Sequence, residues 1–299
     1  MTDGLVVVDK PWGMTSHDVV ARCRKVFGQR RVGHAGTLDP DATGVLLVGL
    51  GQATRLLQFV SGLLKSYTGE IVLGVSTTTL DASGEPTARW DMQAVTLTDA
   101  RKAASGLTGP IEQVPPMVSA IKIGGRRLHE LAREGVEVPR PARPVTVSRF
   151  DLEIAGDQDP GPLGGGPVFA ASVECSSGTY IRTLAADLGT RLGGGAHLRR
   201  LRRTAIGPWT LAEAVPLDDI GPGNVAPPAA ALADRPALTV DGELVEAVGH
   251  GQVLERAQLG AVGEGPWAVL DQSGALLAVY ADHGSGRAKP LVVLSRAAS

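Results

Sequence analysis

The residues best suited to chemistry lie together near the N-terminus, in the segment 33–44. The segment contains one imidazole, His34, and two carboxylates, Asp39 and Asp41. Pro40 restricts the residue before it to an extended conformation, so Asp39 is expected on a stiff, turned stretch of chain. A carboxylate fixed in this way can act as a nucleophile, as a general base or by stabilising positive charge. The residues alone do not decide between Asp39 and Asp41.

The same segment has an ordinary interpretation as a turn, because Asp-Pro and Gly-rich sequences are typical of turns whatever their function. The apolar residues 45–51 that follow predict a buried strand, which would anchor the segment on its C-terminal side. Residues 5–9 predict a first strand, and Ser16 is the expected N-cap of a helix with apolar residues at positions 19, 20, 23, 26 and 27. These elements would hold the segment in place.

Two further segments carry side chains that could join a site. Residues 65–74 alternate as a strand and include Tyr67, which on pattern alone is a half-buried strand tyrosine. Residues 179–192 predict a helix, and Arg182 follows one of its apolar positions; its ordinary role would be a surface ion pair of little energetic weight. Helices are also expected at 53–64 and 99–107, a helix start at Arg126 and Arg127, and strands at 118–123, 142–154, 168–175 and 197–206.

These segments together resemble a known family. Residues 33–46 meet every fixed position of the pattern G-H-x-G-x-L-D-P-x-A-T-G-V-L, which is typical of the TruB-type tRNA pseudouridine-55 synthases. The resemblance is to an actinobacterial-like member and covers about two-thirds of the chain or more. Four further matches occur in the family's order, at residues 10–16, 65–67, 176–184 and 195–203.

Strands and helices that mix without regular alternation predict the α+β class. The resemblance implies the pseudouridine-synthase fold, with a long mixed, mainly antiparallel sheet and a central cleft. It implies a catalytic domain at residues 1–225, with an RNA-clamping insertion at about 111–143. It also implies a PUA-like C-terminal RNA-binding domain at residues 237–299. The residues themselves indicate a Pro- and Ala-rich linker at 222–236 and, from 238 onward, short apolar runs between Gly turns that suggest a small β-rich domain.

The resemblance also implies roles for site residues. It favours Asp39 over Asp41 as the essential carboxylate. It pairs Arg182 with Asp39, and it places Tyr67 on the target uracil. The reaction breaks the glycosidic C–N bond, turns the uracil and joins its C5 to C1′, so no cofactor and no metal is expected. Residues expected to contact the substrate or line its pocket are His34, Asp81, Tyr180, Leu201 and Arg202.

Several of these residues have ordinary alternatives. His34 could be a hydrogen-bonded loop histidine, and Tyr180 and Leu201 could be plain core residues. Basic side chains are the candidates for phosphate contacts, although they could also be ordinary surface charges. These candidates are Arg126, Arg127, Arg140, Arg143, Arg199, Arg200, Arg202 and Arg203.

The composition limits the class of protein. The 299 residues are 43% hydrophobic with a net charge of −2, which fits a globular protein and does not by itself indicate a nucleic-acid partner. From residue 237 onward seven acids stand against four bases, which leaves 24 acids and 25 bases in the rest of the chain, so that part is close to neutral with basic clusters. The two cysteines, Cys23 and Cys175, indicate neither a disulfide framework nor a metal site. No signal peptide or membrane span is predicted, so a soluble cytoplasmic protein is expected.

The expected substrate is the T arm of tRNA, with uridine 55 turned out of the stack before reaction. A tRNA-binding or folding protein without catalysis remains open, as does a synthase acting on another RNA, for instance a guide-RNA-dependent relative. A hydrolase is disfavoured, because the chain has no G-x-S-x-G motif and no metal-spaced pair of histidines. A monomer without an obligatory protein partner is expected.

Overall fold

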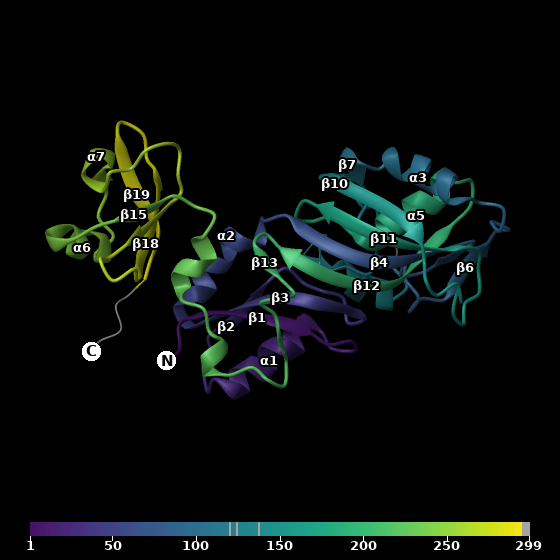
Figure 1. The fold of residues 1–299 in the computed structure, drawn as a ribbon, viewed down its shortest axis with the longest axis horizontal. Coiled ribbons are helices and arrows are strands. Elements are labelled where there is room, and N and C mark those ends of the chain that lie inside the picture. The colour runs from purple at the N-terminus through teal and green to yellow at the C-terminus, as the bar shows by residue number, and fades with distance from the viewer. Residues whose placement is uncertain (120, 124, 137, 295–299) are drawn as a thin grey trace. The chain divides into compact units, whose positions relative to one another are not determined.

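The computed structural model describes residues 1–294 except 120, 124 and 137, and the chain forms two compact units. Unit 1 comprises Met1–Asp39, Val45–Gly62 and Pro208–Ser299, and unit 2 comprises Pro40–Gly44 and Leu63–Gly207. Unit 1 is therefore built from three separate stretches of sequence. The colour gradient in Figure 1 shows this, since the purple N-terminal strands lie with green segments from after residue 208.

The N-terminal part of unit 1 consists of four strands of the ten-stranded sheet, with helix α1 (Ser16–Val26) against them. Thr15, not Ser16, is the N-cap: its hydroxyl accepts from the backbone N–H of Asp18, whose carboxylate accepts from the backbone N–H of Thr15. The expectation for Ser16 was wrong by one position, because its hydroxyl is buried and bonded elsewhere. The strands are β1 (Gly4–Lys10), β2 (Val32–Ala35), β3 (Ala42–Leu50) and β14 (Val215–Pro216).

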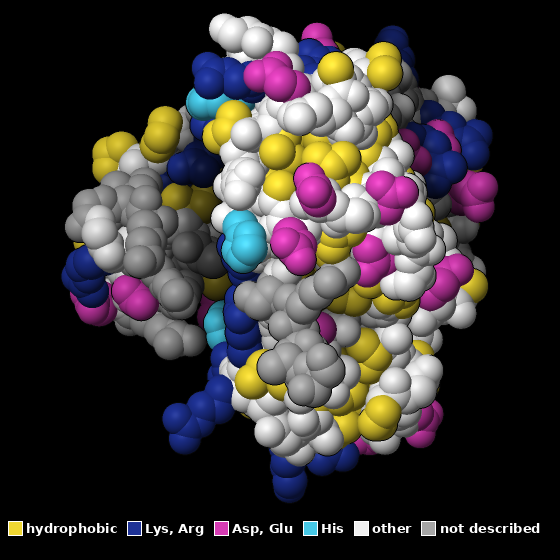
Figure 2. Space-filling view, turned by 90° about the vertical axis from the view of Figure 1, so that its left-hand side faces the viewer, with side chains coloured by type: hydrophobic (Ala, Val, Ile, Leu, Met, Phe, Trp, Pro, Cys, Tyr) yellow, Lys and Arg dark blue, Asp and Glu magenta, His cyan; other side chains and the backbone are white. Residues whose placement is uncertain are grey.

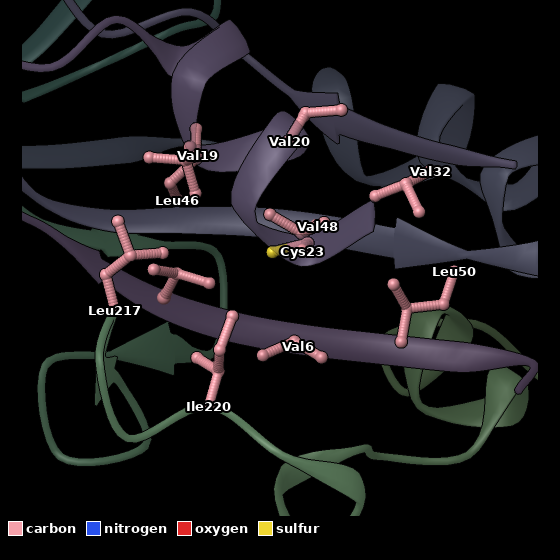
Figure 3. Packing of buried hydrophobic residues seen from close by; sticks show 11 residues of the cluster. Val6, Val19, Val20, Cys23, Val32, Leu46, Val48, Leu50, Leu217 and Ile220 are labelled. Carbon is pink, nitrogen blue, oxygen red and sulfur yellow. The ribbon is translucent and has the colours of Figure 1, made fainter. Parts of the chain in front are cut away.

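The core of this part lies between α1 and the strands (Figure 3). Helix α1 buries Val19, Val20 and Cys23, the apolar positions that recur at helical spacing. Strands β1 and β3 supply the opposite side, and residues 217 and 220 close it from a much later part of the chain. Burial of these side chains is the main stabilising contribution. The cluster consists of Val6, Val8, Val19, Val20, Cys23, Val32, Leu46, Val48, Leu50, Leu217 and Ile220.

The segment after β3 is less helical than the sequence suggested. A 3₁₀ helix, η1 (Gly51–Leu56), is followed by the short helix α2 (Leu57–Ser61), in place of one helix over 53–64. Gly51 begins η1 with a positive φ, and Gly62 caps α2, so the chain leaves the helix before Leu63 and Leu64.

The C-terminal part of unit 1 is a five-stranded sheet in the order β15-β17-β18-β19-β16, and this confirms the expected β-rich C-terminal part. Trp267 and Tyr280 are the largest side chains of its core. The segment expected as a linker contains two 3₁₀ turns, and Ala231 and Leu232 within it are buried. The elements are η2 (Pro222–Asn224), η3 (Pro228–Leu232), β15 (Ala237–Thr239), α6 (Gly242–Gly249), β16 (Leu254–Glu255), α7 (Arg256–Leu259), β17 (Trp267–Leu270), β18 (Leu276–Asp282) and β19 (Arg287–Val293).

Unit 2 is built on a mixed sheet, as expected. The first residues of β3 pair in parallel with β12, with Ala42 opposite Leu201, and the next strands, β4, β11, β10 and β7, are antiparallel. Helices α3 and α5 pack on this sheet. The strands are β4 (Lys65–Leu73), β7 (Gly109–Gln113), β10 (Arg143–Ile154), β11 (Val168–Cys175) and β12 (Ala196–Ile206), and the helices are α3 (Leu97–Ser105) and α5 (Ile181–Arg191).

Smaller elements complete unit 2. The expected helix start at Arg126 and Arg127 was wrong, since both lie in strand β9 and the helix begins after them. Residues 120, 124 and 137 of the expected insertion, and residues 295–299 of the expected C-terminal domain, lie outside the described residues. The elements are β5 (Val75–Thr77), β6 (Pro86–Arg89), β8 (Lys122–Ile123), β9 (Arg126–Arg127) and α4 (Leu128–Arg133); β13 (Trp209–Thr210) follows in unit 1.

Candidate active site

Asp39 lies in the loop that joins β2 to β3, and its side chain is half-buried, whereas Asp41 is exposed. The residue before it, Leu38, is fixed by the side chain of Ser16. The hydroxyl of Ser16 accepts from the backbone N–H of Leu38 over 2.9 Å and donates to its carbonyl oxygen over 3.2 Å. On the other side, the chain passes through Pro40 into β3. The loop that carries the carboxylate is therefore fixed on both sides of Asp39, and a fixed backbone is what a group needs if it is to react from one orientation.

His34 lies on strand β2, opposite Val48 of β3, and not in a loop as expected. All four residues of β2, Val32–Ala35, pair with β3, so the first residues of the 33–46 motif lie in a strand. The imidazole packs edge-to-face with that of His17, with ring centroids 5.4 Å apart. Helix α1 therefore helps to fix the orientation of His34.

Arg182 stands in the first turn of α5 and is 4% exposed. Its guanidinium donates from Nη1 to the carbonyl of Thr79 and from Nη2 to the carbonyl of Val118, each over 2.9 Å. Its Nε lies 3.5 Å from Oδ2 of Asp81. A buried charge needs such partners, and together they orient the planar guanidinium.

Asp81 organises the turn that holds Arg182. Its Oδ1 accepts from the hydroxyls of Thr79 and Ser83, each over 2.6 Å, and from the backbone N–H of Ser83 over 3.1 Å. The turn is attached to β12 through a bridge between Asp81 and Leu198. One carboxylate therefore positions both its own turn and the guanidinium of Arg182.

Tyr67 and Tyr180 lie in different environments. Tyr67 is buried on β4, in register with Val173 of β11 and Arg203 of β12. Tyr180 is half-buried and is the N-cap residue of α5, two positions before Arg182. The sequence pattern therefore described Tyr67 correctly as a strand tyrosine, and this burial is compatible with either a core or a pocket role.

The arginines of the basic strand β12 differ in their exposure. Leu201 and Arg202 are half-buried, and Nη1 of Arg202 donates to the hydroxyl of Thr43 over 3.2 Å. Arg203 is 1% exposed, so it cannot offer phosphate a surface charge and that expectation was wrong. Arg199 is also unsuited to the role, because its nearly buried guanidinium lies 2.8 Å from Glu70. Arg200 keeps a largely exposed side chain, and its guanidinium also lies 3.4 Å from Glu70 and 3.7 Å from Asp157.

Comparison with known proteins identifies the family. Residues 24–181 match the description "TruB family pseudouridylate synthase (N terminal domain)", and residues 182–223 match "tRNA pseudouridylate synthase B C-terminal domain". The chain belongs to the TruB family. It is 50% identical to the tRNA pseudouridine synthase B of Symbiobacterium thermophilum, covering 83% of this chain and 82% of that protein. It is 46% identical to the protein of that name from Arthrobacter sp., covering 99% and 97% respectively.

Solved structures agree with the TruB fold. The chain aligns with one in the crystal structure of a Cbf5-Nop10-Gar1 complex with a TM-score of 0.72 and 25% identity, covering 98% of this chain and 84% of that one. A chain in the structure of an H/ACA RNP bound to a substrate RNA containing 2′-deoxyuridine aligns with a TM-score of 0.68 and 25% identity, covering 93% and 77%. The α+β class and the mixed sheet predicted from sequence are therefore confirmed.

The TruB chain contains a buried cation that pattern reading did not single out. Lys65 is 5% exposed, and its Nζ donates to the carbonyl of Leu63 over 2.9 Å. Burial, together with the nearby charge of Arg203, lowers the pKa of Lys65 to about 8. Lys65 and Tyr67 are two residues apart on β4 and so share one face of the strand. The strand partners of Lys65, Cys175 of β11 and Ile206 of β12, come from distant parts of the chain, so the local sequence gave no signal.

The candidate residues divide between the units. Asp39 and His34 belong to unit 1, and the other candidates belong to unit 2, where the structure brings Asp81 and Arg182 together. Within the part of the chain that the structure describes, no group of three or more His, Cys, Asp or Glu side chains could hold a metal ion. Among those residues there is also no helix that is both long and apolar enough to cross a membrane. The unit 2 candidates are Tyr67, Asp81, Tyr180, Arg182, Leu201 and Arg202.

Proposed function

We propose that this protein converts uridine 55 in the T loop of tRNA into pseudouridine, with Asp39 as the essential carboxylate. The observation that carries the proposal is that a TruB-family chain presents Asp39, half-buried, on a loop fastened one residue earlier by Ser16. The relatives at 46–50% identity are named tRNA pseudouridine synthase B, which supports tRNA as the substrate.

The reaction is an isomerisation and needs no outside group. The glycosidic bond between C1′ and N1 breaks, the freed uracil turns, C5 bonds to C1′, and the C5 proton is lost while N1 gains one. Asp39 in its ionised form serves as the nucleophile, base or charge stabiliser of the first step. A held carboxylate suits this role because its orientation is fixed before the substrate arrives.

Arg182 and Tyr67 assist Asp39 in this proposal. The guanidinium of Arg182 pairs with the carboxylate of Asp39 and favours its ionised form. The support for this role is that Arg182 is buried and oriented by Asp81 and two carbonyl groups. Tyr67 stacks on the uracil, and its hydroxyl accepts the C5 proton after the new bond has formed.

The target base must leave the helical stack before it can react, and RNA loops allow this at the least cost. His34 occupies the gap left by the extruded base, Tyr180 and Leu201 line the pocket, and Arg202 contacts the RNA. Asp81 acts through Arg182. The exposed Arg200 is the clearest phosphate contact on β12, since its side chain is 65% exposed.

The domain, partner and location expectations belong to the same proposal. We place the catalytic domain at residues 1–225, the RNA clamp at about 111–143 and a PUA-like RNA-binding domain at residues 237–299. On the side of the molecule shown in Figure 2, acidic side chains scatter over the centre and basic ones gather toward the margins, so a strong phosphate grip is not expected there. The enzyme acts as a cytoplasmic monomer without an obligatory protein partner; its buried, free cysteines suit a reducing compartment.

The deciding experiment follows tritium release from tRNA transcript labelled at uridine C5, with wild type and Asp39→Asn. We expect release from position 55 with wild type only, and retained tRNA binding by the variant. Tight binding without release by wild type would leave a tRNA-binding or folding protein. Release from another RNA but not from tRNA would indicate the alternative of a synthase with a different substrate.

A further inference from the structure

We propose that Ser16 is a positioning residue for Asp39: it aligns the carboxylate without touching the substrate. The inference rests on the proposed function, because it assumes that Asp39 is the reacting group. It concerns the motif Lys10–Ser16, whose side chains have no role in the reaction described above.

The Ser16 hydroxyl forms two hydrogen bonds with Leu38, the loop residue before Asp39; this pair of bonds is called the clasp below. The hydroxyl accepts from the N–H of Leu38 and donates to the carbonyl oxygen of the same residue, at 2.9 and 3.2 Å. A hydroxyl group can do both at once, because it carries one donor and two lone pairs. Ser16 is 1% exposed and the side chain of Leu38 is buried, so water is shut out of the clasp.

The clasp fixes Asp39 through the peptide bond. The carbonyl group of Leu38 and the N and Cα atoms of Asp39 lie in one rigid plane. The bond to the Leu38 carbonyl holds this plane directly, and the bond from the Leu38 N–H holds the preceding peptide plane, so Leu38 is held on both sides of its Cα atom. Pro40 restricts the rotation of the Asp39 backbone on the other side. Together these constraints leave the carboxylate few orientations besides those of its own side-chain rotamers.

The neighbouring residues of the motif have different tasks. The buried Nζ of Lys10 donates to the carbonyls of Pro11 and Met14 and so braces the turn before α1. Thr15 caps α1, and its hydroxyl is exposed. Ser16, one residue later, faces inward to the Asp39 loop, 22 residues away in sequence. Adjacent hydroxyls therefore support the helix and the loop separately, which provides a matched control.

The test compares Ser16→Thr with Ser16→Val, two side chains of the same shape of which only threonine keeps the hydroxyl. Single-turnover rates are measured with saturating C5-tritiated tRNA, alongside Kd and Tm. We expect the valine variant to react up to about 100-fold more slowly than the threonine variant, the loss typical of a misplaced reacting group. Kd should stay within about twofold, since the clasp does not contact RNA. Thr15→Ala should lower Tm but leave the rate near that of wild type.

Equal rates for the threonine and valine variants would overturn the proposal, and so would a rate loss in Thr15→Ala as large as that in Ser16→Val, since helix stability would then explain both. Ser16→Ala also removes the hydroxyl but adds no volume, so its single-turnover rate, compared with that of wild type, tests the proposal if the threonine and valine variants do not fold. Failure of the proposed function looks different: wild type itself would release no tritium from tRNA.

Discussion

The side-chain amide of Gln113 hydrogen-bonds both backbone polar groups of Tyr180. Its Nε2 donates to the Tyr180 carbonyl over 3.1 Å, and its Oε1 accepts from the Tyr180 N–H over 2.8 Å. Gln113 is the last residue of β7 and is 2% exposed, and Tyr180 is the N-cap of α5. A buried amide thus ties the end of one strand to the start of the helix that carries Arg182.

Replacing Gln113 with leucine should lower the free energy of unfolding by about 1–3 kcal/mol, because the two backbone groups lose their partner. It should also slow the reaction, since the start of α5 sets the position of Arg182. Urea unfolding and single-turnover kinetics measure the two effects. Gln93→Leu is the control: that exposed amide donates to the carbonyl of Gly165, and its loss should change stability by less than about 0.5 kcal/mol. Equal effects of the two substitutions would contradict the prediction.

Gly44→Ala should disrupt the pairing of β3 with β12. A Cβ atom at Gly44 would lie 2.2 Å from the carbonyl oxygen of Arg203, and its φ of +103° is unfavourable for alanine. Because backbone atoms make the clash, we expect a Tm loss of more than about 10 °C, corresponding to at least 3 kcal/mol. Gly62→Ala is the matched control, with open space around its Cβ and a φ of −80°. A calorimetric scan that gave both variants the same Tm would refute the steric argument.

Asp81→Asn should weaken the support of Arg182 while leaving an acceptor for Thr79 and Ser83. The Nε of the buried Arg182 lies 3.5 Å from Oδ2 of Asp81, and a contact of this kind between charged groups is worth at most about 1.5–3 kcal/mol. The rate at saturating tRNA should fall more than the affinity. Asp218→Asn removes the partner of Arg22 at the same separation of 3.5 Å, but at an exposed site, and should have no measurable effect. A harmless Asp81→Asn would show that the two carbonyl groups suffice to orient Arg182.

Lys65→Met should stabilise the protein at neutral pH and change its pH dependence. The pKa of Lys65 falls from 10.5 to about 8 on folding, chiefly through burial. Between these two pKa values the unfolded chain binds more protons than the folded chain, so stability rises with pH. Below pH 8 Lys65 is charged in both states, and its burial then destabilises the folded state by the full amount of about 3 kcal/mol. Urea titrations at pH 7 and 10 should show the variant's advantage over wild type at pH 7 and its decline at pH 10. A stability difference that does not change with pH would contradict this prediction. Burial raises the pKa of the Cys23 thiol to about 11, but Cys23 is present in both proteins, so its effect cancels in the comparison.

Local sequence was sufficient to predict an element where the residues themselves restrict the backbone to one kind of structure. The strands at 65–73 and 168–175 and the helix at 181–191 lie where alternation and helical spacing placed them. The loop around Asp39 could be found because its Gly, Asp and Pro residues restrict the backbone whatever surrounds them. These are short-range effects.

The sequence could not reveal contacts made by residues far apart in the chain. Whether Ser16 or Thr15 caps α1 depends on Leu38, which draws the Ser16 hydroxyl inward. Nothing in the local sequence distinguishes Arg199 and Arg203 from exposed arginines. Arg199 is paired with Glu70 of another strand, and Arg203 is buried by the packing of neighbouring strands. Gln113 had no distinguishing pattern, since its role arises only when β7 meets the start of α5.

The parallel pairing of β1 with β14, in which Val8 lies opposite Val215, has a consequence for biosynthesis. At translation speeds of about 5–20 residues per second, the first strand waits about 10–40 s for its neighbour to leave the ribosome. Until then one edge of β1, which lies beside β3 in the sheet, lacks its β14 neighbour. The N-terminal third of the nascent chain therefore cannot complete its sheet as an independent domain, and a chain that stops before residue 215 leaves that edge open to chaperones and to aggregation.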